Sequence, residues 1–318
     1  MVEIRKIYEP NLWNDLLYKT QNDSVFSTFE WGEYKKNTNW KVERLAFFKS
    51  GNFLGIVQLF YKIKFGVFVG WSNSGINYTN FSNLSLIIDT LKKYLSKYHF
   101  FYNRFSFFEH FEDLKYFEFN QVLFESKKYI NSNFSIIHHL SSDFYTKFSS
   151  NHRYYFKQSC KNNLTFSEIG LQSFIILHNE MTQAKQMPKI TISLDKINLL
   201  KSAFGDNLKF FGIFRNSNLI CGSAILFYKN KAYYYLAASN ESGRKNYAAY
   251  FMIYNIFDFL VLKDIKEFDF MGITPFDKNA FGVNKFKLGF GGDVCYYLGE
   301  WEISNSNLLS FLINRIYL

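Results

Sequence analysis

Two stretches of this sequence resemble each other, and their repetition predicts the fold. Residues 47–62 read Phe47-Phe-Lys-Ser-Gly-Asn-Phe-Leu-Gly-Ile-Val-Gln-Leu-Phe-Tyr-Lys62, and residues 213–229 read Ile213-Phe-Arg-Asn-Ser-Asn-Leu-Ile-Cys-Gly-Ser-Ala-Ile-Leu-Phe-Tyr-Lys229. Each stretch is an apolar run, a polar turn and a second apolar run, which is the pattern of a β-hairpin. With a one-residue insertion, Phe48 aligns with Phe214, Gly55 with Gly222 and Tyr61 with Tyr228. A repeat at about half the chain length predicts the duplication of one α/β unit.

Segments of helical and strand-like periodicity alternate around both hairpins. Leu84, Ile87, Ile88, Leu91 and Leu95 share one helical face, whereas the aromatic residues of 101–108 fit no helical period. The predicted helices are 11–19, 28–36, 84–98, 151–161, 172–186 and 247–262, and the predicted strands are 42–48, 54–62, 67–70, 101–108, 209–214, 219–229, 232–238 and 267–271. This alternation predicts an α/β (α+β) fold with two tandem domains, 1–145 and 146–318, and a ligand cleft between or beside them.

Composition and charge narrow the class of protein. The 318 residues are 48% hydrophobic, which excludes a disordered chain, and 37 Lys and Arg against 27 Asp and Glu favour polyanionic partners. The three cysteines, far apart, indicate neither a disulfide framework nor a structural zinc site. Without a signal-peptide pattern or an uninterrupted membrane-spanning run, we expect a cytoplasmic protein, with peripheral contact to a membrane left open.

A glycine-rich cluster near the C-terminus is the strongest local candidate for a site. Five glycines occur between Gly272 and Gly292, and Lys285 and Lys287 flank Phe286. Glycine permits close approach to a ligand, and lysine supplies a point charge for an oxygen-rich group. Two tight turns around a strand explain the same glycine spacing, so both interpretations stay open.

A basic segment forms the second candidate. Arg153, Lys157 and Lys161 recur every four residues, which places three cations on one face of a predicted helix, with Tyr154 and Tyr155 beside them. Such a face suits the phosphates of a nucleic acid, and a solvated charged helix is the alternative.

Together these segments resemble the FemABX aminoacyltransferase family. The matching stretches are Phe29-Glu-Trp-Gly-Glu-Tyr-Lys-Lys36, Asn151-His-Arg-Tyr-Tyr-Phe-Lys-Gln158, Cys221-Gly-Ser-Ala-Ile-Leu-Phe-Tyr228, Tyr235-Leu-Ala-Ala-Ser239, Phe268-Asp-Phe-Met-Gly-Ile273 and Val283-Asn-Lys-Phe-Lys-Leu-Gly-Phe-Gly-Gly292. The resemblance implies two tandem acetyltransferase-like (GNAT) domains. It also implies transfer of an amino acid from aminoacyl-tRNA to an amine-bearing cell-wall or surface-glycan precursor.

The resemblance also implies roles for individual residues. Phe286 and Lys287 match the family's Phe-Lys pair, which is implicated in the transfer site, and Lys35 or Lys36, after Trp31, matches a lysine region that contacts acceptor phosphates. Further substrate-binding candidates are Tyr235, Asp269 and Gly272 on the matching stretches and Arg104 on the predicted strand 101–108. The tRNA-binding candidates are Arg153, Lys157 and Lys161.

One strand end departs from the family pattern. Muropeptide-using members tend to carry an Arg-x-Asp-Pro-like sequence where this chain reads Arg104-Phe-Ser-Phe107. Because the carboxylate is missing, a muropeptide and another nucleotide- or lipid-linked sugar or peptide precursor are both admissible acceptors.

The leading hypothesis is therefore tRNA-dependent aminoacyl transfer, in which Lys287 stabilises the oxyanion of an ester aminolysis. Asp269 and Asp293 are the nearest candidates for a base, and an activated ester demands no metal or nucleotide cofactor. The runner-up is an acyl-CoA-dependent GNAT-type N-acyltransferase acting on a surface polysaccharide precursor, although Tyr247 occupies the place of the first glycine in its pyrophosphate loop. A non-catalytic module that binds glycan or tRNA is the third alternative.

Overall fold

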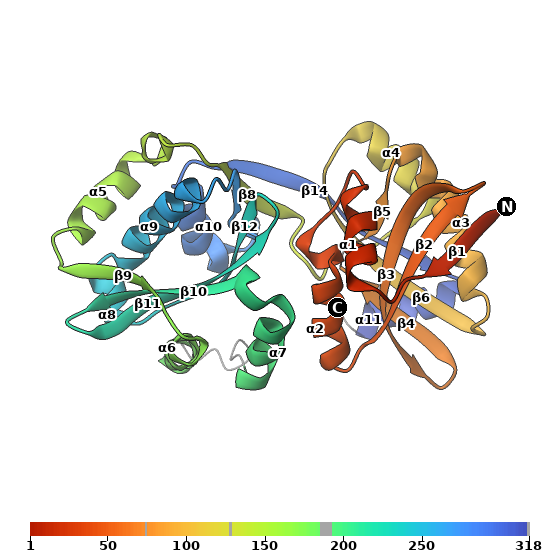
Figure 1. Ribbon diagram of the computed structural model, residues 1–318, viewed down its shortest axis with the longest axis horizontal. Helices are drawn as coiled ribbons and strands as arrows, with labels where there is room; N and C mark the ends of the chain where they lie inside the picture. Colours follow the sequence, from red (N-terminus) through yellow and green to blue (C-terminus); the bar gives the residue numbers. More distant parts are fainter. Residues whose placement is uncertain (74, 127–128, 185–192, 317–318) are drawn as a thin grey trace. The chain divides into compact units, whose positions relative to one another are not determined.

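A computed structural model describes residues 1–73, 75–126, 129–184 and 193–316 (Figure 1). Internal contacts divide the chain into unit 1, Met1–Asn133 with Tyr296–Leu318, and unit 2, Phe134–Cys295. This division differs from the boundary expected at 145/146, because the segment from 134 onward lies with the second unit and the chain returns to the first unit at its end. In the described residues, no helix combines the length and apolar character needed to cross a membrane.

Unit 1 is built on a mixed sheet. Its strands are β1 (Val2–Lys6), β2 (Lys41–Lys49), β3 (Asn52–Lys64), β4 (Val67–Ser72), β6 (Phe100–His110) and, from residue 296, β14 (Asp293–Ser304), in that order, with β5 (Ile76–Tyr78) on β3 and β7 (Phe124–Glu125) on β14. Its helices are α1 (Pro10–Tyr18), α2 (Phe29–Asn37), α3 (Leu84–Leu95), α4 (Asp113–Val122) and α11 (Asn307–Ile316). The predicted apolar face of α3 is fully buried against the sheet, in a core that includes Trp301.

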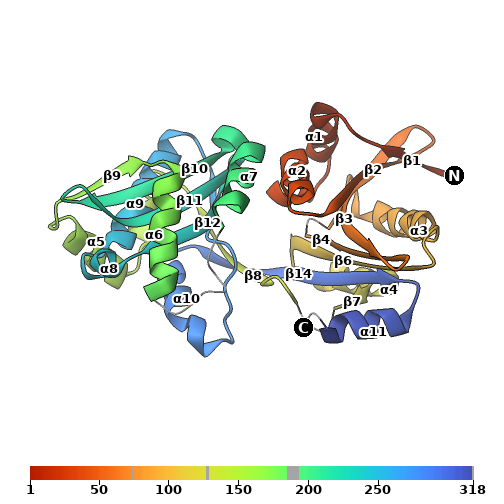
Figure 2. The ribbon, with the colours of Figure 1, turned by 90° about the horizontal axis from the view of Figure 1, so that it is seen from below.

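Unit 2 repeats this plan. Its strand order is β8 (Phe134–His139), β13 (Glu267–Asp269), β12 (Lys231–Ser239), β11 (Asn218–Tyr228), β10 (Leu208–Arg215) and β9 (Leu164–Glu168). Its helices are α5 (Ser150–Ser159), α6 (Leu171–Ala184), α7 (Leu194–Phe204), α8 (Glu241–Lys245), α9 (Ala248–Leu262) and α10 (Phe281–Leu288). Helices α6 and α9 cover opposite faces of the sheet (Figure 2). Consecutive side chains of β10 point to opposite faces, so Phe210 meets Phe174 of α6 and Phe211 meets Phe259 of α9.

The predicted duplication is confirmed in the topology of the two units. The series β2-β3-β4-α3-β6 corresponds to β10-β11-β12-α9-β13, and the last two strands of each series pair in parallel. Both first hairpins turn through two residues with positive φ, Ser50-Gly51 and Asn216-Ser217, and both carry a β-bulge shortly after the turn, with Leu54 and Ile220 as the extra residues. The two hairpins predicted from the sequence therefore occupy equivalent places.

The predicted alignment of the two hairpins is wrong by one residue along their second strands. Phe47 pairs with Gly55, and Ile213 pairs with Cys221, so the structural equivalent of Gly55 is Cys221 and not Gly222. Turn and bulge together set the register of a hairpin, and both are the same in the two copies. The matching glycine identity therefore misled the alignment, and no insertion separates the copies here.

Candidate functional site

Lys287 lies on α10 beside the end of β13, in unit 2. Its ammonium nitrogen donates to the carbonyl oxygens of Met271, at 3.2 Å, and Gly272, at 2.8 Å. Within the described residues no carboxylate lies close enough to form an ion pair with it. Burial lowers the pKa of Lys287 to about 8, and the charge of Asp269 opposes that shift. The side chain is thus a cation that can exchange a proton near neutral pH.

Asp269 shapes the backbone that holds this lysine. Its carboxylate accepts hydrogen bonds from the Ser135 hydroxyl and from the Met271 amide, at 2.7 Å. Burial raises its pKa, against the effect of these hydrogen bonds. Met271 has a φ of 61°, which is unusual for a residue with a side chain, and the bond from Asp269 helps to hold that turn. The carboxylate therefore orients the carbonyl groups that Lys287 contacts.

A pocket of about 770 Å³ opens beside this cluster, within unit 2. Its walls come from the start of α5, from α9, from the loop before α10 and from α10 itself. The lining residues are Ser149, Asn151, His152, Tyr155, Tyr250, Ile273, Pro275, Phe281, Gly282, Asn284, Lys285, Phe286, Leu288 and Gly289. A pocket of this size with an aromatic lining is typical of sites for small organic ligands.

The Phe-Lys pair divides its two side chains between the pocket and the Lys287 cluster. The glycine spacing predicts turns in this segment, whereas residues 281–288 form a helix. Phe286 of that helix lines the pocket and packs against Tyr250 and Phe290. Lys287 points instead to the carbonyls of the 271–272 turn. Adjacent residues on a helix diverge by about 100°, which produces this division.

Most of the glycines in the cluster serve packing. A Cβ on Gly289 would lie 1.9 Å from Cε1 of His152, one on Gly291 would lie 2.1 Å from the Lys147 carbonyl oxygen, and one on Gly292 would lie 2.7 Å from Ile136. Gly282, in contrast, lines the pocket with open space beside it. Packing therefore explains three of the five glycines. The alternative expected from the sequence, two tight turns around a strand, differs from the structure, in which residues 281–288 are helical.

His152 and Asn284 are two residues of this site that sequence reasoning missed. His152 is buried, with Nδ1 3.0 Å from the Ser149 hydroxyl and Nε2 2.9 Å from the carbonyl oxygen of Phe286, and burial lowers its pKa. The amide of Asn284 bonds both backbone groups of Thr274. Both lie on stretches that match the family pattern, but their hydrogen bonds to other segments of the chain cannot be read from a local pattern.

Tyr235 lies at the same end of the sheet as Lys287. It is the extra residue of a β-bulge in β12, because Ala224 pairs with Leu236 while Ile225 pairs with Tyr234. The neighbouring Tyr233 pairs with Asp269 of β13, and the two strands run in parallel. A bulge commonly re-aims side chains next to a functional site, which is consistent with the predicted role of Tyr235.

In unit 1 the structure separates the two lysines that the sequence left as alternatives. Lys35 lies among four aromatic rings, with its nitrogen 5.3 to 6.0 Å from the centroids of Trp31, Trp40, Phe60 and Trp71. Burial lowers its pKa to about 8. Lys36 is exposed, and its Nζ lies 3.7 Å from Oε2 of Glu33. Lys35 is thus a desolvated cation whose favourable contacts are with aromatic faces.

Trp31 is a wall of this cluster. Its ring is 4% exposed, its indole nitrogen donates to the Asn73 side chain at 3.2 Å, and it packs edge-on against Phe26. Trp31 thus helps to hold Lys35, and a substrate contact by Trp31 stays a prediction.

Arg104 does not reach a substrate surface. It is 2% exposed, forms a 3.1 Å ion pair with the equally buried Glu300 and donates to the Tyr102 hydroxyl. Glu300 in turn accepts the backbone amides of Ile130 and Asn131. This buried network explains the arginine structurally, and the predicted binding role of Arg104 is not supported.

The basic face on α5 is smaller than expected. The helix ends at Ser159, so Lys161 lies beyond it, and the guanidinium of Arg153 donates to the carbonyl oxygens of Thr146 and Phe148. Lys157 and Lys161 are exposed and Arg153 is half-buried. Binding of tRNA phosphates by this region stays a prediction, carried by the two lysines.

Tyr247 occupies the position where an acyl-CoA enzyme would bind pyrophosphate. It precedes α9 with a φ of 56°, and its ring stacks on Tyr155 with centroids 5.1 Å apart. A bulky side chain at the start of this helix is consistent with the argument against a pyrophosphate loop. Among the described residues, no group of three or more metal-ligating side chains is placed to hold a metal ion.

Comparisons with known proteins agree with this architecture. The profile of the FemAB family matches residues 173–317, and no curated protein matches the sequence. The crystal structure of FemX is similar with a TM-score of 0.85 and 16% identity, over 98% of this chain and 100% of that one.

Two further structures share the fold at a greater distance. L-PGS from Bacillus licheniformis has a TM-score of 0.59 and 10% identity, over 97% of this chain and 96% of that one. A tandem GNAT protein from the clavulanic acid biosynthesis pathway has a TM-score of 0.56 and 7% identity, over 96% and 99%. The fold is therefore the predicted mixed α/β fold of tandem GNAT-like proteins.

Proposed function

The chain is a member of the FemAB family through residues 173–317, and on that premise we propose that it is an aminoacyltransferase. Its donor is aminoacyl-tRNA, and its acceptor is an amine-bearing cell-wall or surface-glycan precursor. The observation that carries this proposal is Lys287: a desolvated lysine, held by two carbonyl oxygens, next to a pocket walled by its neighbour Phe286.

Lys287 has the properties that ester aminolysis needs. The acceptor amine attacks the aminoacyl carbonyl carbon, an oxyanion forms, the bond to the ribose oxygen breaks, and the attacking nitrogen loses a proton. An ammonium group has three donors, of which Met271 and Gly272 take two, so one remains for the oxyanion or the departing ribose oxygen. With its pKa at about 8, the same group can give up and regain a proton during turnover.

Lys35 is the residue that we assign to the acceptor. Among the described residues Lys35 has no carboxylate partner, and aromatic rings surround it. Desolvating such a cation is costly until an anion reaches it. Phosphate groups that link a precursor to a nucleotide or a lipid supply such an anion. Because Arg104 is buried, Lys35 takes the larger share of acceptor recognition in this proposal.

Transfer assays with two donors test the proposal. Purified protein is mixed with aminoacyl-tRNA labelled in the amino acid, or with labelled acetyl-CoA, together with an extract that supplies acceptors. Labelled acceptor is expected only with the tRNA donor. Transfer from acetyl-CoA alone would establish the acyl-CoA alternative, and no transfer from either donor would favour a binding module.

The variant Lys287→Met ties the activity to the site. We expect kcat to fall about tenfold or more, because one oxyanion donor is worth that much or more. Lys278→Met, at an exposed lysine in the short η6 turn (Lys278–Ala280), is the matched control and should keep native turnover. Native turnover in Lys287→Met would remove this residue from the mechanism.

A further inference from the structure

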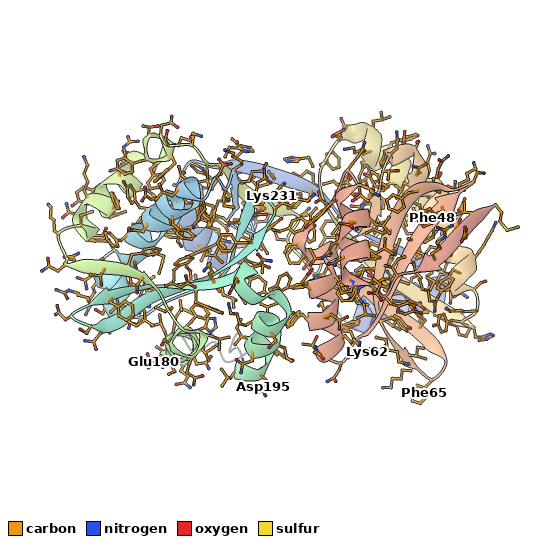
Figure 3. The ribbon with its side chains drawn as sticks, in the orientation of Figure 1. Phe48, Lys62, Phe65, Glu180, Asp195 and Lys231 are labelled. Atoms are coloured by element: carbon orange, nitrogen blue, oxygen red, sulfur yellow. The ribbon has the colours of Figure 1, made fainter. Side chains whose placement is uncertain are left out.

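The turn between β3 and β4 has an unusual tip. Lys64 pairs with Val67, so Phe65 and Gly66 form a two-residue turn, with φ angles of 52° and 75°. Turns of this kind favour Asn-Gly or Asp-Gly, because the first residue must adopt a left-handed backbone. Phe65 is nevertheless aromatic and 93% exposed, at the end of the hairpin (Figure 3). An aromatic residue is therefore unfavourable here in two ways: its backbone is left-handed, and its apolar ring is exposed to water.

The other hairpin turns in the described residues show what this turn needs for folding alone. Their tips are Ser50-Gly51, Asn216-Ser217 and Lys229-Asn230, all of them polar. Lys229 occupies the place of Phe65 in the duplicated unit and has nearly the same φ, 53°. The geometry of the turn therefore does not require phenylalanine. A residue that violates local sequence preference without a structural benefit points to a function.

The charged residues of this hairpin all have one sign. Lys62 and Lys64 precede Phe65 and are exposed, and no Asp or Glu occurs anywhere between Glu43 and Asp89. Further apolar surface lies at the same end of the sheet: Ile63 is 40% exposed, and Phe100, which pairs with Val67, is 41% exposed. An apolar tip with basic flanks complements the surface of an anionic lipid bilayer.

We propose that the β3–β4 hairpin tip, residues 62–66, docks on an anionic membrane. Phe65 and Ile63 enter the interface, while Lys62 and Lys64 lie against lipid phosphates. The hairpin is continuous with the Lys35 cluster, because both lysines lie over the ring of Trp40. The ring centroid is 5.1 Å from Nζ of Lys62 and 5.7 Å from Nζ of Lys35. A docked hairpin therefore holds Lys35 near the phosphates of a lipid-linked acceptor, a consequence that rests on the function proposed above.

Vesicle co-sedimentation tests the docking without donor or acceptor, so its failure would leave the proposed transferase activity untouched. The vesicles contain phosphatidylcholine and phosphatidylglycerol in equal parts, or phosphatidylcholine alone. Binding is expected to the anionic vesicles only, and to weaken as salt is raised. Absence of binding to anionic vesicles, or equal binding to both kinds, would overturn the proposal.

Three variants locate the contact. Phe65→Asn should weaken binding to the anionic vesicles about tenfold or more. The single variants Lys62→Gln and Lys64→Gln should each weaken it about fivefold. Phe117→Gln removes a phenylalanine that is 63% exposed on α4 and should bind like the native protein. Asparagine suits the left-handed turn, so Phe65→Asn should keep its melting temperature or raise it. Native binding by Phe65→Asn would show that the hairpin tip is not the docking site.

Discussion

Nε2 of His152 lies 2.9 Å from the carbonyl oxygen of Phe286, and this contact fastens the start of α5 to α10. The ring fits there because residue 289 is glycine: a Cβ would lie 1.9 Å from Cε1 of His152. The position of the pocket wall, and of the lysine that follows Phe286, therefore depends on a histidine more than a hundred residues earlier in the chain.

Gly289→Ala should destabilise unit 2. The new methyl group must push the His152 ring out of place, and overpacking of this kind costs about 1–3 kcal/mol. Thermal unfolding measures the effect, and turnover should fall with it because α10 shifts. Gly282→Ala is the control for stability, since nothing lies within 4 Å of a Cβ there. Equal melting temperatures for the two variants would contradict the packing role of Gly289.

Lys287→Arg separates charge from proton exchange. In the native protein a pKa of about 8 means that the neutral amine becomes abundant as the pH rises through that value. If the neutral amine accepts the proton of the attacking nitrogen, kcat should rise with pH and level off above about 8. Arginine stays charged, so the variant should lose this limb and be slower. A native profile in Lys287→Arg would leave Lys287 with a purely electrostatic role.

The burial of Lys287 also affects folding stability. Its pKa is lower in the folded state than the 10.5 of an ordinary lysine, so between about pH 8 and 10.5 the unfolded chain binds more protons. The free energy of unfolding therefore rises with pH across that window. Below the window the buried charge of Lys287 lowers the stability of the folded state. Chemical denaturation of the native protein and of Lys287→Met between pH 7 and 10 should show a steeper rise in the native protein.

Lys35→Met and Lys36→Met should have different effects on the acceptor. Lys35 is surrounded by aromatic rings, so methionine should fit without loss of stability, while KM for the acceptor rises about tenfold or more. Lys36 is exposed near Glu33, and its replacement should change KM little. Steady-state kinetics with varied acceptor measure both. A larger effect at Lys36 would reverse the assignment.

Lys157→Gln combined with Lys161→Gln should weaken tRNA binding and flatten its dependence on salt. Arg153→Gln should instead lower the melting temperature, because its guanidinium bonds the carbonyls that precede α5. Filter binding across a salt titration distinguishes the cases. An unchanged salt slope in the double variant would return this region to an ordinary solvated surface.

Local pattern was sufficient for most of the architecture. The hairpin repeat at 47–62 and 213–229, the apolar face of α3 and the long apolar helix α9 all follow from periodicity and turn chemistry, which act between near neighbours in sequence. The motif also singles out the Phe286-Lys287 pair as a candidate for the site. Such signals survive because each residue's environment at these positions is set mainly by its own helix or strand.

Contacts between distant segments determined the rest. Lys35 and Lys36 are indistinguishable in sequence, and only the packing of Trp40, Phe60 and Trp71 around one of them desolvates it. Arg104 reads as a binding residue until Glu300, almost two hundred residues later, neutralises it in the core. Lys287 meets carbonyl groups fifteen and sixteen residues away because Asp269 and Met271 turn the chain toward it. Desolvation and charge pairing depend on which surfaces meet in three dimensions, and a linear pattern of residue types does not specify that meeting.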